Sequence, residues 1–326
     1  MKKQKRPTLA DVARQAGTST AVVSYVVNDG PRRVSPQTRE RVNQAIKQLG
    51  YRRNTLAAAL KGNKSNLVGL VVPDASNAFF GELSTRMEGE ASRRSLLTLL
   101  GNTHYGAESE QKYERAFSDL NCMAIFIVGV GDGSRVDSKR IYLHAAPPGS
   151  SSPSVVFDNF AGAVGAVEHL LGHGYSDVHC LTGPVDHGPT ALREQGFRAA
   201  GGETMHRFPR DRKEAEEAMV SMLDSDAPRA VFCTTDEHAL ACLRAAGRQG
   251  LRVPEDLAIV GFDGINEALN GSVAITTVSL PLDELAVTAF EMLDAWRGDV
   301  PPSSKTLPSS LLIGETCGCE REIRSP

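Results

Sequence analysis

Apolar residues near the start of the chain recur at intervals of three and four positions, the spacing that places side chains on one face of a helix. The residues of this face are Leu9, Val12, Ala13 and Ala16. Thr8 is a favoured N-cap, Asp11 three residues later gives a near capping box, and Gly17 suits the left-handed residue that ends a helix. The pattern therefore predicts a short helix followed by a tight turn.

Ser19 can cap a second helix, whose inner face is apolar and whose outer face carries short or flat side chains. The inner residues are Val22, Val23 and Val26, and the outer residues are Thr20, Ala21, Ser24 and Tyr25. Two helices around a glycine turn, with small residues outside the second, are typical of a DNA-reading helix-turn-helix. An ordinary helical hairpin is the alternative that this segment alone leaves open.

A third helix begins at Ser35 and Pro36, as N-cap and first helical residue, and ends at Gly50. Its inner face consists of Val42, Ala45, Ile46 and Leu49. The Ala-rich turn at 55–61 is too short to be helical alone in water, so we expect it to be helical only when docked on DNA or on a partner copy. These patterns predict a head at 1–53 and a hinge and linker at 54–66.

From Leu67 the pattern changes to strands alternating with helices, the first strand being continuously apolar as in a buried parallel sheet. The expected strands are 67–72, 96–100, 124–130, 140–144, 155–157, 178–181, 205–208, 230–233, 257–262, 274–278 and 310–313. The expected helices are 80–94, 108–120, 160–171, 190–200, 212–223, 237–249 and 282–296. Repeated strand–helix units predict doubly wound α/β sheets. About a dozen strands exceed one comfortable sheet, so we expect residues 67–326 to form two similar lobes with a ligand cleft between them.

The charge distribution separates the head from the rest of the chain. The whole chain of 326 residues carries a formal net charge of −3. Residues 1–64 contain 14 Lys and Arg against 3 Asp and Glu, or +11, and the remainder contains 22 against 36, or −14. A basic head on an acidic body is the electrostatic signature of a nucleic-acid-binding domain fused to another domain. A solvated basic tail fits poorly, because the charges interleave with periodic apolar residues.

Several other classes of protein lack the sequence features they need. No apolar run approaches the roughly 20 residues that span a bilayer, and no apolar segment follows the basic start as in a secretory signal. We therefore expect a cytoplasmic protein with six reduced cysteines. The glycines at 129–133 lack the spacing of a dinucleotide site, and no nucleophile elbow, phosphate loop or zinc-protease motif occurs. No catalytic site and no cofactor are expected.

No metal site is expected either. Cys317 and Cys319 form a C-G-C pair, which lacks the two-residue gap of a zinc knuckle or redox motif. The eight histidines show no metal spacing, and His169, His173 and His179 are interpreted as surface or internally satisfied residues.

Recognisable motifs occur along the whole chain. In the head they are TLADVARQAG, S-x-x-x-V-S-x-V-x-N at Ser19–Asn28, VSPQTRERV and LGY. In the body they are VGLVVPDASNAFF, DNFAGA, EHLLGHGY, LTGP, LREQGF, RVPEDLAIVGFD and ITTVSLPLDELA. In this order the motifs resemble the LacI/GalR family of bacterial transcription regulators over essentially the whole chain. The resemblance implies a periplasmic-binding-protein-like body. It also implies a homodimer that binds a near-palindromic double-stranded DNA operator.

The resemblance also implies which residues contact DNA. The second helix of each head would lie in the major groove, and two paired hinge helices would lie in the minor groove. Leu60 stands where the family places an apolar wedge between base steps, and plain hinge packing is the alternative for this residue. The full set is Thr8, Ser19, Thr20, Ala21, Ser24, Tyr25, Asn28, Arg39, Asn54, Leu56 and Leu60.

The effector site follows from the same resemblance. Phe79 and Phe80 stand where relatives stack an aromatic ring on the ligand, with a place in the core as the alternative. Arg193 would reach the ligand, and Asp263 would accept from sugar hydroxyls. The full set is Phe79, Phe80, Arg193, Phe208, Thr235 and Asp263. A sugar or a sugar derivative is the family expectation for the effector.

The chain departs from the family pattern at several positions. Tyr25 and Ala58 replace common arginines, Gly264 replaces a common aspartate, His144-Ala145 replaces an aspartate and a larger residue, and 131–153 is short. These departures predict a competent head with an unusual or degenerate ligand pocket. We expect a sequence-specific, effector-controlled DNA-binding regulator that acts as a repressor. The alternative is a solute-binding protein of the periplasmic type, against which the basic head and the missing signal argue.

Overall fold

The computed structural model contains two compact units, Met1–Ser65 and Asn66–Pro326. We call them the head and the body. It describes residues 7–27, 33–51, 65–129, 138–147, 149–184, 188–225 and 228–319. Among these residues, no helix combines the length and the apolar character needed to cross a membrane.

The head contains three short helices, α1 (Leu9–Gln15), α2 (Thr20–Val27) and α3 (Pro36–Leu49). Thr8 and Asp11 form the complete capping box at the start of α1, and Ser35 caps α3 through the backbone N–H of Thr38. Gly17 and Gly50 both have φ of +60°, as their places after helices require. The buried core consists of Val12, Ala13, Ala16, Val23, Val26, Val42 and Ala45. Val22, expected inside, is only half-buried.

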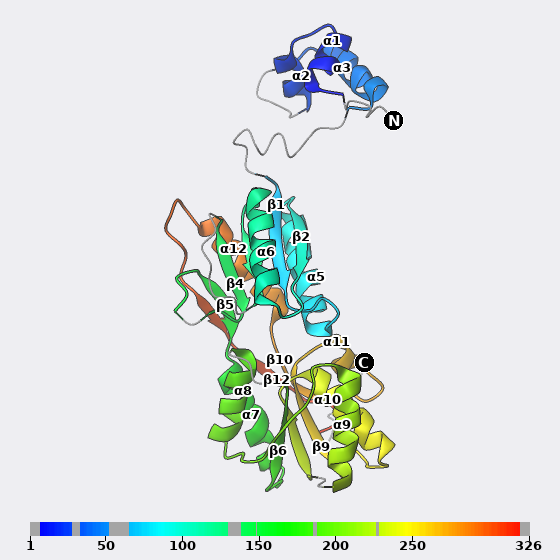
Figure 1. Ribbon diagram of the computed structural model, residues 1–326, viewed down its shortest axis with the longest axis vertical. Coiled ribbons are helices and arrows are strands. Elements are labelled where there is room, and N and C mark those ends of the chain that lie inside the picture. Colours follow the sequence, from blue (N-terminus) through cyan, green and yellow to red (C-terminus); the bar gives the residue numbers. More distant parts are fainter. Residues whose placement is uncertain are drawn as a thin grey trace. The chain divides into compact units, whose positions relative to one another are not determined.

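The body is built from two lobes, each a twisted sheet covered by helices (Figure 1). The first lobe contains β1 (Leu67–Val72), α5 (Ala78–Arg93), β2 (Leu97–Asn102), α6 (Ala107–Asp119), β3 (Ile125–Ile127), β4 (Arg140–His144), β5 (Ser154–Phe157), α12 (Leu282–Ala295) and β11 (Lys305–Leu307). Its six-stranded sheet has the order β11-β5-β4-β3-β1-β2, and every neighbouring pair is parallel.

The second lobe has a sheet of the same size. Its elements are α7 (Asn159–Gly172), β6 (Val178–Thr182), α8 (Pro189–Ala199), β7 (Met205–Arg207), α9 (Arg212–Ser225), β8 (Ala230–Cys233), α10 (Asp236–Arg248), β9 (Ala258–Asp263), α11 (Asn266–Asn270), β10 (Thr276–Ser279) and β12 (Ser310–Leu312). The strand order is β12-β10-β9-β8-β6-β7, and only the edge strand β12 runs antiparallel. The expected pair of parallel-sheet lobes is confirmed.

The chain passes between the two lobes three times, after β5, after β10 and after β11. Two elements of this arrangement were not expected from the sequence, namely α11 and β11. Helix α11 has only five residues, too few for a periodic pattern. Strand β11 (KTL) is mostly exposed and carries no apolar run, although it pairs with β5 at the edge of the first sheet.

Candidate DNA-reading head and effector cavity

The outer face of α2 carries the residues expected to read DNA. Thr20 and Ala21 are exposed, and Ser24 and Tyr25 are half-buried. The sequence of α2, TAVVSYVV, contains no charged residue, so this helix can offer bases only short polar, methyl and phenol groups. Positive charge lies on the flanking helices instead, where Arg39 is half-buried.

The other expected DNA contacts divide into two groups. Thr8 uses its hydroxyl within the head, donating to Asp11 Oδ2 at 2.6 Å, and Ser19 Oγ accepts from the backbone N–H of Val22 at 3.3 Å. Both residues therefore hold the helix starts in place, and both are exposed. Asn28, Asn54, Leu56 and Leu60 lie outside the residues that the structure describes.

The body contains a cavity of about 160 Å³ that both lobes line. Its first-lobe residues are Pro73, Asn77, Phe79, Phe80, Tyr105, Val128, Gly129, His144 and Ala145, and its second-lobe residues are Gly183, Pro184, Pro189, Thr190, Arg193, Arg210, Thr235, Glu237, His238 and Asp263. Many of them come directly from the carboxyl ends of strands, where ligand sites of doubly wound sheets form. His144 ends β4, and Asp263 ends β9.

Arg193 is the best-held polar group of the cavity. Its Nε donates to Asn159 Oδ1 at 2.8 Å, and its Nη1 donates to the carbonyl oxygen of Thr234 at 2.6 Å and pairs with Asp263 Oδ1 at 2.8 Å. The guanidinium also lies 3.9 Å from the centre of the Phe262 ring. Nη2 is buried and has no hydrogen-bond partner, so the N–H groups of this one nitrogen are left to donate to a ligand.

A close contact between two helices fixes the position of Arg193. Arg193 stands on α8, and its partner Asn159 begins α7. The helices meet at Gly196, where an added Cβ would lie 2.5 Å from the carbonyl oxygen of Phe160. Glycine therefore allows the backbone approach that sets Arg193 against Asn159.

Two buried carboxylates lie beside this arginine. Burial raises the pKa of Asp263 to about 6, and the charge of Arg193 opposes that rise. Burial and then the charge of Asp263 raise the pKa of Asp236 to about 7. Asp236 accepts from Thr277 Oγ1 at 2.6 Å and from the backbone N–H of Ile265 at 2.9 Å. The second lobe therefore buries acidic groups that take up protons near neutral pH.

The first lobe contributes an aromatic wall. The Phe79 ring lies 5.2 Å from the Phe80 ring and 4.7 Å from the His144 ring, centre to centre. Burial, and then the charge of Arg193, lower the pKa of His144 well below its usual value, so its imidazole is neutral. Its Nδ1 is buried without a partner. This wall combines apolar ring faces with one further hydrogen-bonding atom.

Backbone strain also gathers at this cavity. His144 has φ of +64° and Asp263 has φ of +125°, values that residues with a side chain rarely adopt. Such strain persists only where the surrounding structure enforces it, and it clusters at ligand sites. The strand ends of both lobes are therefore held in unusual conformations beside the same cavity.

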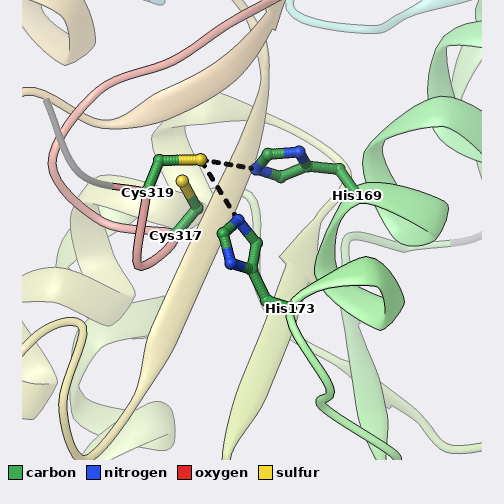
Figure 2. Close-up of side chains that lie close together, drawn as sticks. All are labelled: His169, His173, Cys317 and Cys319. Atoms are coloured by element: carbon green, nitrogen blue, oxygen red, sulfur yellow. Dashed lines mark hydrogen bonds between the residues drawn. The ribbon is translucent and has the colours of Figure 1, made fainter. Parts of the chain in front are cut away.

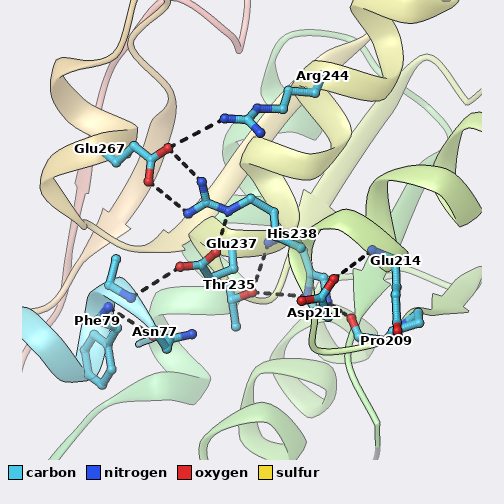
Figure 3. A network of polar contacts seen from close by, with 12 residues as sticks. Asn77, Phe79, Pro209, Asp211, Glu214, Thr235, Glu237, His238, Arg244 and Glu267 are labelled. Carbon is cyan, nitrogen blue, oxygen red and sulfur yellow. Dashed lines mark hydrogen bonds and ion pairs between the residues drawn. The ribbon is translucent and has the colours of Figure 1, made fainter. Parts of the chain in front are cut away.

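Polar contacts connect the two lobes at the rim of the cavity (Figure 3). Glu237 Oε1 accepts from the backbone N–H of Ala78 in the first lobe at 3.4 Å, and Glu237 Oε2 pairs with Arg212 Nε at 2.6 Å. Arg212 also holds both carboxylate oxygens of Glu267, at 2.7 and 2.9 Å. The side chain of Glu237 thus bridges the start of α5 and a second-lobe ion-pair network.

Five of the six expected effector residues line the cavity, and one lies in the core. Phe79, Phe80, Arg193, Thr235 and Asp263 line the cavity. Phe208 is buried in the body core and is not one of the lining residues. Thr235 caps α10, since its Oγ1 accepts from the backbone N–H of His238 at 3.3 Å.

Sequence reasoning missed several lining residues, among them Tyr105, Arg210, Glu237 and His238. Glu237 and His238 lie two and three positions after Thr235, and their place shortly after the end of β8 was the available signal. Arg210 lies over the Tyr105 ring at 4.4 Å, a contact between the lobes that no sequence spacing predicts. The structure also brings together His169, His173, Cys317 and Cys319, which sequence reasoning treated as unrelated.

Comparison with known proteins agrees with this architecture. Residues 8–54 match the family described as bacterial regulatory proteins, lacI family, and residues 167–317 match a periplasmic binding protein-like domain. The HTH-type transcriptional regulator DegA of Bacillus subtilis (strain 168) is 31% identical over 300 residues, which cover 86% of this chain and 88% of DegA. The regulator GalS of Salmonella typhimurium is 32% identical, covering 87% of this chain and 88% of GalS.

Solved structures share the fold. A lac repressor dimer bound to operator and the anti-inducer ONPF has a TM-score of 0.83 at 24% identity, covering 96% of this chain and 99% of the repressor chain. The transcriptional regulator CelR in complex with cellobiose has a TM-score of 0.65 at 26% identity, covering 95% and 100% of the two chains.

Head, body and cavity together define a helix-turn-helix transcriptional regulator with a periplasmic-binding-type ligand domain. The matches favour this class over a solute-binding protein without a DNA-binding head. The chain belongs to the LacI family of bacterial transcriptional regulators.

Proposed function

We propose that this regulator is a cytoplasmic repressor. As a homodimer it binds a near-palindromic operator, and a small-molecule effector in the cavity controls operator affinity. Relatives support the repressor role and the dimer on operator DNA, since PurR of Vibrio atlanticus is described as a repressor and the lac repressor structure holds a dimer on operator DNA. In this arrangement residues 1–53 read DNA, residues 54–66 form the hinge, and residues 67–326 bind effector and dimerise.

The unpartnered Nη2 of Arg193 carries the proposal of an effector site. The other nitrogens of this guanidinium are fixed by Asn159, Asp263 and the Thr234 carbonyl. A buried donor without a partner is costly in a folded protein and is rarely retained. A ligand oxygen that accepts from Nη2 completes the fork and offsets that cost.

The chemistry of the lining residues favours a carbohydrate. Asp263 can accept hydrogen bonds from hydroxyl groups, and Arg193 can donate to them. Nδ1 of the neutral His144 can donate or accept, according to the tautomer of the ring. The rings of Phe79 and Phe80 offer apolar faces to C–H groups of a sugar ring. A volume of about 160 Å³ lies below the roughly 300–1,000 Å³ of drug-sized sites. We therefore favour a monosaccharide or a derivative of one.

Selection of bound genomic fragments tests DNA binding with the full chain. We expect enrichment of one near-palindromic sequence, with affinity that falls steeply as salt rises because Lys and Arg displace counterions from phosphates. Leu60→Ala should weaken specific binding more than non-specific binding, as loss of a minor-groove wedge requires. Binding without sequence preference, or without salt dependence, would contradict the proposal.

Calorimetry then measures the binding of candidate effectors, namely pentoses, hexoses, their phosphates and purine bases. The genes beside the selected fragments decide which candidates are measured first. His144→Asn is the variant of choice, because asparagine tolerates positive φ better than most residues and replaces the imidazole ring with a smaller amide. We expect it to weaken effector binding while operator affinity without effector is kept. His104→Asn is the matched control, because His104 also has a positive φ, +51°, and is not one of the residues that line the cavity. An unchanged effector affinity in His144→Asn would place the ligand elsewhere.

A further inference from the structure

The second lobe assembles two histidines and two cysteines far from each other in sequence. His169 and His173 stand at the carboxyl end of α7, and Cys317 and Cys319 belong to the segment after β12. One donor atom from each residue lies within 4.8 Å of the other three. Figure 2 shows both sulfur atoms on the side of their segment that faces the two imidazole rings.

From this geometry we propose that the four side chains form a tetrahedral Zn²⁺ site. Zinc in structural sites binds four N and S donors, with Zn–N distances of about 2.0–2.1 Å and Zn–S distances of about 2.3 Å. Those lengths place N and S donors about 3.5 Å apart. Cys319 Sγ lies 3.1 Å from His173 Nε2 and 3.7 Å from His169 Nε2, so two edges of the tetrahedron already have nearly the required length.

Each pair of ligands is held by its own element. His169 lies in the last turn of α7 and His173, four residues later, is the C-cap of this helix, so the two side chains share one helix face. Gly318 separates the two cysteines and has φ of +94°, a tight turn that a residue with a side chain rarely adopts. Within each pair, the two ligands are therefore held close together by a short stretch of backbone.

The segment that carries the cysteines is anchored independently of a metal. Thr316 is completely buried, its Oγ1 donates to the carbonyl oxygen of Ile259 at 2.6 Å, and its Oγ1 accepts from the backbone N–H of Thr276 at 2.9 Å. The N–H of Ile259 donates in turn to the Thr316 carbonyl at 2.7 Å. These bonds fix the residue before Cys317 to β9 and β10, so both ligand pairs lie on rigid parts of the lobe.

The donor set selects the metal. Two imidazoles and two thiolates suit zinc, whereas Ca²⁺ and Mg²⁺ require oxygen ligands, and the group contains no carboxylate. Two thiolates also balance the charge of Zn²⁺. Cys317 is buried and His173 is exposed, so an ion can reach the site from solvent while the sulfur end is shielded.

Zinc at this position would fasten the carboxyl-terminal segment to α7. That helix begins at Asn159, the residue that orients Arg193 in the effector cavity. The metal therefore stabilises the lobe behind the cavity.

The test uses the untagged full chain, reduced and treated with a chelator, and titrates it with Zn²⁺ against a chromophoric chelator. We expect one Zn²⁺ per chain and a higher urea midpoint of unfolding with zinc. We also expect Co²⁺ substitution to give the intense visible bands of a tetrahedral site with thiolate charge transfer. Removal of one ligand should lower the zinc affinity by more than the roughly 10–100-fold that follows removal of a residue hydrogen-bonded to a ligand.

Cys319→Ser and His173→Ala remove one ligand each, and Cys122→Ser and His104→Ala are the matched controls outside the cluster. We expect only the first pair to lose zinc affinity and the cobalt spectrum. Equal zinc binding by all four variants, or octahedral cobalt without charge transfer, would overturn the proposal. So would a Cys317–Cys319 disulfide that resists the reductant. None of these readouts depends on operator or effector binding, so the proposed function is tested separately.

Discussion

Removal of Arg193 should be costly because it leaves a charge buried. The pair that Arg193 makes with Asp263 lies almost wholly out of solvent, with side-chain exposures of 2% and 6%. Breaking such a pair by removing one partner costs about 3–5 kcal/mol, because the remaining carboxylate is left uncompensated. We expect Arg193→Met, which keeps much of the side-chain volume, to lower the free energy of unfolding of the body by that amount.

A double-mutant cycle with Asp263→Asn isolates the charge pair from the other contacts of the guanidinium. We expect the double variant to be more stable than the sum of the single losses by about 2–3 kcal/mol. The chain has one tryptophan, Trp296, which lies in the body. Urea unfolding followed by its fluorescence therefore reports on the body alone.

The penalty should also depend on pH. Without Arg193 the pKa of Asp263 rises above about 6, because the opposing positive charge is gone. When the pKa of a carboxyl group is higher in the folded than in the unfolded protein, the free energy of unfolding falls as pH rises from the unfolded pKa to the folded pKa. Arg193→Met should therefore cost less at pH 5 than at pH 8. Additive single losses, or a penalty that is the same at both pH values, would refute this account of the pair.

Three further predictions follow from the same structure. Gly196→Ala should destabilise the body by about 1–3 kcal/mol, because the added Cβ would lie 2.5 Å from the Phe160 carbonyl oxygen. Gly165→Ala is the control, since its Cβ would have no neighbouring atom within 4 Å, and it should be neutral or stabilising. Urea unfolding of the two variants measures the difference. The raised pKa values of Asp236 and Asp263 mean that their contribution to stability falls as pH rises from about 4 to 7, so Asp236→Asn should flatten the pH profile of the urea midpoint. Glu237→Gln should weaken the contact between the lobes, which faster proteolysis of the ligand-free body would reveal; unchanged proteolysis would argue against it.

Much of the fold was predictable because its strands are short, apolar and regularly spaced. Leu67–Val72, Arg140–His144 and Ala230–Cys233 begin and end where the sequence pattern predicts. Strand β11 was missed because its stability comes from pairing with β5, whose partner residues lie 150 positions earlier in the sequence. Periodicity reports burial along a segment, and β11 is mostly exposed.

The cavity was predictable only in part. Resemblance pointed to Arg193 and Asp263, yet the three-way hold on the guanidinium depends on Asn159 and on a backbone carbonyl. Phe208 sits in a family-like position but packs into the core. The cluster of His169, His173, Cys317 and Cys319 was not predicted, because the spacing within each pair does not by itself mark a zinc site. Only the tertiary fold brings the two pairs together.

The three passages between the lobes mean that neither lobe is one continuous stretch of chain. The first lobe combines the segment that ends with β5 and the later segment from α12 to β11, and the second lobe takes in everything between them together with β12. No single cut in the polypeptide therefore releases an intact lobe. During synthesis the first sheet must wait for β11 before its edge is complete. We expect the two lobes to gain their final stability together, late in translation, and fragments split between lobes to need each other in order to fold.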